Sequence, residues 1–332
     1  MTGITHRSTT DPSSAWTNLA SAELGAEVLY ATDDFFAEKE RMLLPSTPVF
    51  VEGLYTDHGK WMDGWESRRK RAPGHDWAIV RLGVPGRIRE VDIDTSFFVG
   101  NYPPHAALEA CLSDGPPDEH TRWTVVLPKV ALDGNARNRH AVHDERTWTH
   151  VRLHIHPDGG VARLRVFGSP ALGAHAGEID LAAMAHGGRV LACSDQHFGP
   201  ATRMLAPGRG ENMGDGWETR RKRVPGNDWA IVKLAAPGRI ERVLLDTCHF
   251  KGNYPDRFAL QAADLRDDPA ADTGAEVPSQ WWPYLLGEQK LQADHEHVYV
   301  DLNDLGVVTH VRVSIFPDGG VSRLRLFGAP AS

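Results

Sequence analysis

Short apolar runs and alternating apolar and polar positions predict β-strands along most of the chain. Residues 77–82 read WAIVRL, a compact apolar run of strand length. Residues 90–95 read EVDIDT, where valine and isoleucine alternate with acidic residues, the period of a strand with one buried face. Residues 151–156 alternate in the same way. The pattern therefore favours an all-β protein.

Proline and glycine mark the expected ends of these strands. Pro85 and Gly86 predict a turn after the first apolar run, and Pro157-Asp158-Gly159-Gly160 predicts a hairpin turn, since proline fixes its backbone angle and glycine tolerates positive φ. Short helices are expected only at Ala20–Ala26 and Ile179–Ala185, each ahead of an early strand.

The pattern occurs twice. Residues 63–82 (DGWESRRKRAPGHDWAIVRL) and 215–234 (DGWETRRKRVPGNDWAIVKL) are identical at 16 of 20 positions. DTSFFVGNYP pairs downstream with DTCHFKGNYP, and THVRLHIHPDGGVARLRVFGSP pairs with THVRVSIFPDGGVSRLRLFGAP. Upstream, EVLYATDDFFAEKERML pairs more loosely with RVLACSDQHFGPATRML. Four blocks in the same order indicate a duplicated, domain-sized unit rather than a short-period solenoid.

The spacing between the blocks gives the domain organisation. We predict a loose tail over 1–14, a first repeat over 15–172 and a second over 173–332. The first copy carries about ten additional residues around 44–62, and the second carries eight around 268–294. Each unit is expected to be a β-sandwich or jelly roll with few short helices.

Composition narrows the class of function. A formal net charge of −8 provides no basic field for nucleic acid, and no apolar stretch has the length of a membrane helix. Cys111, Cys193 and Cys248 are an odd number of cysteines with no CxxC spacing. Together with a polar N-terminal stretch that does not resemble a signal peptide, they favour reduced thiols and a cytoplasmic protein.

The block DGWE(S/T)RRKR–PG–DWAIV(R/K)L, followed by DT–F–GNYP and PDGGV–RLR, resembles the allantoicase family. The resemblance extends over both repeats. It implies two jelly-roll units related to galactose-binding domains, and hydrolysis of allantoate to ureidoglycolate and urea in purine degradation. We also expect a homo-oligomer. Allantoate is a small carboxylate with two ureido groups on one carbon, so its site needs a cation, amide-like partners and a proton donor.

The arginine pairs are the candidate carboxylate ligands. Arginine forms a bidentate fork with carboxylate, and the pairs Arg68/Arg69 and Arg220/Arg221 recur in both copies. The alternative is a solvated or ion-paired surface run. Trp65 and Trp217, just before these pairs, are candidate walls of the substrate site.

Carboxylates and amides supply the other candidate groups. Glu66 and Glu218 follow tryptophans, and a carboxyl group beside an indole can have its pKa raised and act as a general acid. The alternative for each is an ion pair with a neighbouring arginine. Asn101 and Asn253, in the GNYP turns, match a ureido group with one acceptor and two donors.

The copies differ after the strand-end aspartate. The second copy has His249 and Lys251 where the first has Phe97 and Val99. Histidine is the usual acid or base near neutral pH, and lysine could bind the carboxylate. We therefore predict that the second copy carries the essential acid–base chemistry, with Asp246 or Glu218 orienting the imidazole. The alternative is an ordinary structural histidine.

The sequence predicts no metal ligands. The pairs His154/His156 and His295/His297 each occur in one copy and lack an evident third ligand, so no cofactor is assigned, and a divalent-metal requirement is not readable from the chain. The competing function is a non-enzymatic tandem sugar-binding module. That alternative predicts two equivalent sites and an export signal, whereas the copies here are asymmetric.

Overall fold

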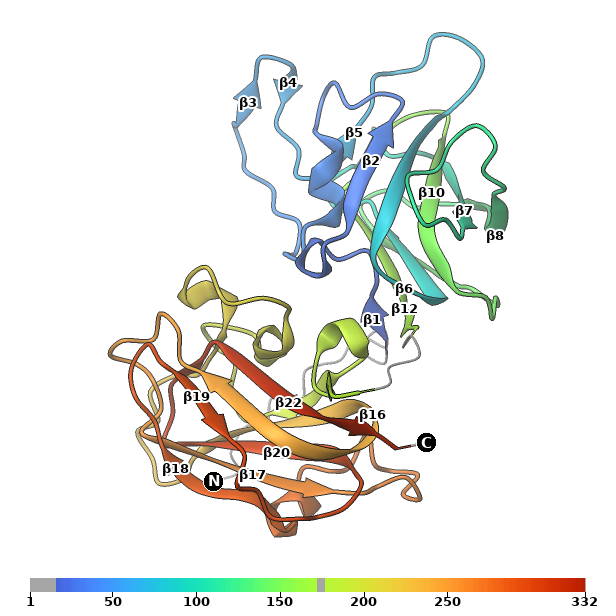
Figure 1. Cartoon of the computed structure of the whole chain (residues 1–332). Coiled ribbons are helices and arrows are strands. Elements are labelled where there is room, and N and C mark those ends of the chain that lie inside the picture. Colours follow the sequence, from blue (N-terminus) through green and yellow to red (C-terminus); the bar gives the residue numbers. More distant parts are fainter. Residues whose placement is uncertain (1–15, 172–176, 332) are drawn as a thin grey trace. The chain divides into compact units, whose positions relative to one another are not determined.

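The computed structural model describes residues 16–171 and 177–331, and the chain divides into two compact units between Ala171 and Leu172. Figure 1 shows both units as β-structures with only short helical turns. The all-β prediction of two tandem sandwich units is therefore confirmed.

Twelve strands build the first unit. They are β1 (Thr17–Asn18), β2 (Glu27–Ala31), β3 (Tyr55–Thr56), β4 (Gly59–Lys60), β5 (Trp65–Glu66), β6 (Asp76–Asp94), β7 (His105–Cys111), β8 (Thr124–Ala131), β9 (Arg137–Ala141), β10 (Trp148–His156), β11 (Gly160–Val161) and β12 (Arg163–Pro170).

The second unit repeats this order without a counterpart of β3 and β4. Its strands are β13 (Ile179–Asp180), β14 (Arg189–Cys193), β15 (Trp217–Glu218), β16 (Asp228–Asp246), β17 (Arg257–Ala263), β18 (Tyr284–Lys290), β19 (Glu296–Tyr299), β20 (Val308–Phe316), β21 (Gly320–Val321) and β22 (Arg323–Pro330). β3 and β4 lie in the insertion expected in the first copy.

One long strand joins the two layers of each sandwich. The first half of β6 pairs with β2 and β10, and its second half pairs with β9 and β12. The predicted turn at Pro85-Gly86 is therefore wrong, because the chain continues as a strand while its partners change. Gly86 is needed there, since a Cβ atom would lie 2.7 Å from the Ser169 carbonyl oxygen.

The Pro157–Gly160 segment is not a hairpin either. β10 pairs with β6 and β7, whereas β12 pairs with β6 and β1, so the segment carries the chain from one layer to the other. Gly159 has φ +138, and a Cβ there would lie 2.7 Å from the Asn101 carbonyl oxygen. This close approach places the segment against the GNYP turn, where candidate site residues lie.

Alternation along the strands builds the core. Ala78, Val80, Val151 and Leu153 face inward from one layer and Val166 from the other, all fully buried. At about 25 cal/mol per Å² of apolar area, such clusters are the main stabilisation of each unit. The outer positions of the same strands remain available for polar groups.

The expected helices are single 3-10 turns. They are η2 (Ala22–Leu24) and η4 (Met184–His186), ended by Gly25 and Gly187 at φ 83 and 108. The other turns are η3 (Lys39–Leu43), η5 (Ala201–Leu205), η6 (Met213–Asp215) and η7 (Pro278–Trp281). No helix among the described residues is long or apolar enough to cross a membrane.

Candidate active site

The tryptophans of the repeated motif belong to the core. Trp65 and Trp217 are fully buried, and their indole N–H groups donate to the carbonyl oxygens of Asp33 and Asp195 at 2.8 Å in both units. The prediction that they form walls of the substrate site is therefore wrong, because neither ring has an exposed face. Their role is to hold the following glutamate and arginines in place.

Glutamate and asparagine meet in both units. The Asn101 amide donates to Glu66 at 2.7 Å, and the Asn253 amide donates to Glu218 at 2.5 Å. β5 and β15 pair with β11 and β21, which fixes both glutamates beside the GNYP turns. Burial raises the pKa of Glu66, although the hydrogen bond from Asn101 opposes it. Each asparagine retains a side-chain oxygen that can accept from a ureido N–H group.

The first arginine of each pair is bound within the protein. Arg68 forks onto Asp33 at 2.7 and 2.6 Å, and Arg220 forks onto Asp195 at 2.8 Å through both nitrogens. Burial alone would raise the pKa of both aspartates, but the arginines and the backbone N–H groups that donate to the carboxylates outweigh it, and the pKa values lie below their usual range. These two arginines are thus ion-paired, as the structural alternative held.

The second arginine of each pair has no protein partner among the described residues. Arg69 and Arg221 are exposed, next to lysines that are ion-paired: Lys70 to Asp76 at 2.5 Å and Lys222 to Asp228 at 2.7 Å. In the second unit Arg221 lines a cavity of about 740 Å³ together with Trp229 and Gln280. These two arginines are free to bind an anionic ligand.

The His249 side chain is fixed by the backbone. Its Nε2 lies 2.8 Å from the Gly210 carbonyl oxygen, which can only accept, so Nε2 carries the proton and Nδ1 the lone pair. The His249 N–H donates to Asp294 at 2.7 Å. The prediction that Asp246 or Glu218 orients this imidazole is therefore wrong.

Asp246 and Lys251 have other partners. Asp246 ends β16, where it accepts from Arg209 at 3.0 Å and from the Cys248 N–H at 2.8 Å. Lys251 is 77% exposed, and its ammonium group lies 4.0 Å from Asp294. Lys251 therefore remains available to a ligand at the loop that carries His249.

One group among the described residues has metal-ligand spacing. Potential ligand atoms of Cys248, His249 and Asp294 lie within 4.8 Å of one another. Burial raises the pKa of the Cys248 thiol, which disfavours the thiolate that a metal would require. Arg209 and Lys251 act electrostatically on Asp294 and oppose a dication there. We therefore assign no metal to this group.

The first unit holds a polar cluster that sequence reasoning missed. His75, His154 and Glu109 are joined by hydrogen bonds. His75 lies just ahead of β6, His154 lies on β10 and Glu109 lies on β7. The sequence singled out His154 only as part of a metal-type pair. A usable signal was present, because the second copy replaces the three residues with Asn227, Ser314 and Gln261.

The comparisons with known proteins agree with the repeats. A family model described as the allantoicase repeat matches residues 17–171 and 179–331. A probable allantoicase of Pseudomonas fluorescens is 53% identical over 96% of this chain and 98% of its own length, and probable allantoicase 1 of Burkholderia mallei is 55% identical over 94% of each chain. The crystal structure of allantoicase from Saccharomyces cerevisiae superposes with a TM-score of 0.81 at 33% identity, covering 97% of this chain and 96% of the yeast chain.

Proposed function

The chain belongs to the allantoicase family, and we propose that its second repeat hydrolyses allantoate with His249 as the acid–base group. The protein is a hydrolase that cleaves one carbon–nitrogen bond of allantoate to give ureidoglycolate and urea. The residue assignment within that reaction is the part that we propose.

The observation that carries the assignment is the loop 247–253 of the second unit. It carries His249, Lys251 and Asn253, and the Asn253 amide donates to Glu218 at 2.5 Å. These groups supply an acid–base imidazole, a cation for the carboxylate and amide partners for a ureido group. Arg221, which follows Glu218 by three residues and has no partner among the described residues, is proposed as a second cation for the carboxylate.

The proton positions suit hydrolysis. His249 Nδ1 takes a proton from water as the water oxygen bonds to the central carbon and the C–N bond breaks. The imidazolium then gives its proton to the departing ureido nitrogen, which keeps the C–N electron pair and leaves as urea. One water is consumed and the imidazole returns to its first state. Asn253 and Glu218 hold the ureido group, and Lys251 and Arg221 hold the carboxylate.

The cellular setting and assembly are part of the proposal. Cys111, Cys193 and Cys248 are all buried free thiols, which supports a reducing, cytoplasmic compartment. Trp281 and Val300 are 84% and 70% exposed, and apolar side chains of this size support burial in a homo-oligomer. Light scattering on the purified protein measures the mass of the assembly, and the mass of a monomer would contradict the proposed homo-oligomer.

The test of the function is product formation by the purified protein. We expect equimolar urea and ureidoglycolate from allantoate. Binding of sugars with no urea released would favour the tandem sugar-binding module instead.

A further inference from the structure

A polar cluster covers the outer face of the layer formed by β2, β6, β10, β7 and β8 in the first unit. Trp77 on β6 pairs with His154 on β10, and Arg152 pairs with both Ile79 and Glu109. Because side chains alternate along strands, Trp77, Glu109, Arg152 and His154 point away from the core. The RRKR loop leads directly into His75 at the edge of this face.

Three of these groups form a continuous hydrogen-bonded chain. Glu109 Oε2 lies 2.8 Å from His154 Nε2, and His154 Nδ1 lies 2.8 Å from His75 Nε2. The His75 ring also contacts the His156 ring, with 4.2 Å between centroids. The chain of contacts therefore runs from a carboxylate through one imidazole to a second, half-exposed imidazole.

The carboxylate determines where the protons lie. An ionised carboxylate only accepts, so His154 Nε2 carries a proton and its Nδ1 accepts from His75 Nε2. Burial lowers the pKa of His75 and of His154, which keeps both rings neutral near pH 7. A neutral His75 then holds its lone pair on Nδ1, for which the described residues offer no protein partner. The relay ends on a basic nitrogen.

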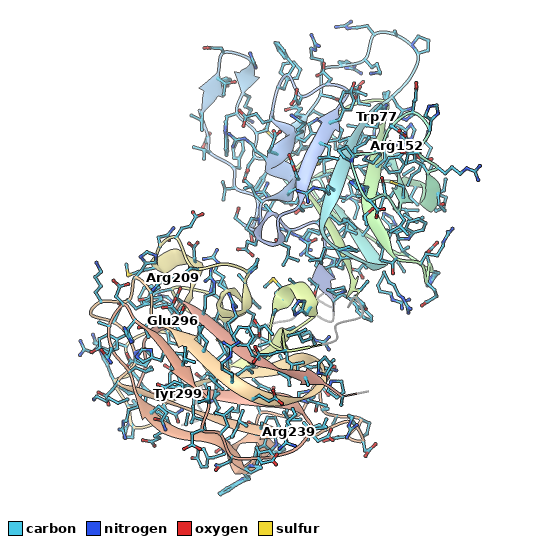
Figure 2. The ribbon with its side chains drawn as sticks, viewed as in Figure 1. Trp77, Arg152, Arg209, Arg239, Glu296 and Tyr299 are labelled. Carbon is cyan, nitrogen blue, oxygen red and sulfur yellow. The ribbon has the colours of Figure 1, made fainter. Side chains whose placement is uncertain are left out.

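Arg152 keeps Glu109 ionised. Its guanidinium donates to Glu109 at 2.8 and 2.5 Å and lies over two indole rings, 4.5 Å from the centroid of Trp123 and 5.6 Å from that of Trp77. Figure 2 shows Trp77 and Arg152 next to each other on this face. Burial alone would raise the pKa of Glu109, but hydrogen bonds from Arg152 and His154 hold it below its usual range.

In the second unit the insertion covers part of the same face. There Gln261 donates to the carbonyl oxygens of Gln280 and Trp282, and Arg312 donates to Ser279 at 2.8 Å. These partners lie in the insertion that only the second copy carries. In the first unit the aromatic face stays accessible, and Tyr30, whose ring is tilted against Trp77 with 4.9 Å between centroids, is 48% exposed. The insertion thus covers part of this face in the second unit and leaves a cavity of about 740 Å³ beside Trp229, whereas the first copy lacks the insertion.

We propose that the first repeat holds a second acid–base centre for the same ureide hydrolysis, in which His75 is the catalytic residue and His154 and Glu109 are positioning residues. This inference rests on the proposed function of the chain. The substrate is a small ureido carboxylate seated beside the RRKR loop, whose Arg69 and Arg71 have no partner among the described residues. Trp77 provides the aromatic side of this site.

The step balances within the relay. His75 Nδ1 takes a proton from water while the water oxygen bonds to the central carbon and the C–N bond breaks. The resulting imidazolium is stabilised through His154 by the Glu109 carboxylate, as in a catalytic triad. It then returns the proton to the departing ureido nitrogen, which leaves with the C–N electron pair as urea.

The test exchanges residues between the repeats. In a His249→Phe chain, the remaining urea release belongs to the first repeat. Adding His75→Asn, the residue of the second copy, is expected to lower that rate by ~10²–10⁴-fold. Glu109→Gln and His154→Ser, also residues of the second copy, are expected to lower kcat with KM unchanged. Free imidazole is expected to restore part of the rate of a His75→Gly variant.

His105→Arg is the matched control, because it copies Arg257, lies on β7 with Glu109 and has no hydrogen bond to the relay among the described residues. It should keep the rate of the His249→Phe chain. The proposal is overturned if the His249→Phe chain has no rate above the double variant, or if His75→Asn leaves its rate unchanged in a folded protein. Absence of urea release by the wild-type chain would instead reject the proposed function.

Discussion

The loops after β6 and β16 have the same backbone conformation, but one carries an apolar ring where the other carries an imidazole. Phe97 and His249 both adopt φ 69, and their N–H groups donate to Asn135 and Asp294. Phe97 stacks on Phe50 of the first-copy insertion at 5.9 Å, whereas His249 reaches the Gly210 carbonyl oxygen. The backbone of the turn is therefore shared by both units. Whether the turn can transfer a proton depends on the side chain at one position, which is Phe97 in the first unit and His249 in the second.

Three residue pairs of the repeated motif have the same contacts in both units. The Arg–Asp, Glu–Asn and Lys–Asp pairs recur in both units at similar distances. A group that is bound identically in both units explains the fold of the motif, and a group that differs is the better candidate for chemistry. The predictions below test this distinction.

The largest expected effect is that of His249→Ala compared with Phe97→Ala. His249→Ala removes the lone pair at Nδ1, so the second-repeat turnover should fall by ~10²–10⁴-fold and leave only the share of the first repeat. Steady-state urea release measures kcat, and Phe97→Ala is the matched control for loss of a side chain. In a His75→Asn background, a near-normal kcat after His249→Ala would make Glu218 or Glu66 the leading acid.

Arg221→Ala compared with Arg220→Ala separates the free arginine from the paired one. In a His75→Asn background, Arg221→Ala should raise KM for allantoate by an amount equivalent to ~1.5–3 kcal/mol, the range for a hydrogen bond to a charged group. Arg220→Ala breaks the pair with Asp195 and should mainly lower the melting temperature. Equal KM values in both variants would return Arg221 to a surface role.

Phe97→Ala should act on stability. The ring is 39% exposed and stacked on Phe50, so its loss is expected to cost roughly 1–2 kcal/mol through lost burial and ring contact. Chemical denaturation measures this change. The matching His249→Ala variant, without such a stack, should lose less, and the reverse order would contradict the comparison.

Glu66→Gln should change the pH dependence of stability. Burial raises the pKa of Glu66 in the folded chain, so its stabilising contribution is complete below the unfolded pKa and is lost as pH rises through the folded pKa. The melting temperature of Glu66→Gln relative to wild type should therefore increase from about pH 4 to about pH 8. A constant difference would show that Glu66 titrates normally.

Local sequence patterns predicted the positions of the strands better than the pairing between strands. The alternation in residues 90–95 and 151–156 gave strands at the right places, because it depends only on which face is buried. The continuity of β6 through Pro85 depends on pairing with segments far away in sequence, which no local pattern contains.

Contacts between segments far apart in sequence also limited the prediction of the site residues. The block repeated in both copies pointed to Glu66 and Glu218, yet it could not show that Arg68 and Arg220 are bound by aspartates upstream of the motif. His75 and His154 are 79 residues apart, and only the sheet register brings them together. A position-by-position comparison of the two copies would have identified His75 and His154, because the second copy has Asn227 and Ser314 in their places.

The most direct test of two differently equipped repeats is the number of substrate sites in one chain. A His249→Phe, His75→Asn double variant should bind allantoate without hydrolysing it, and calorimetric titration counts the sites. We predict two allantoate molecules per chain, one lost on adding Arg69→Ala and Arg71→Ala and the other on adding Arg221→Ala. A single site per chain would contradict the account.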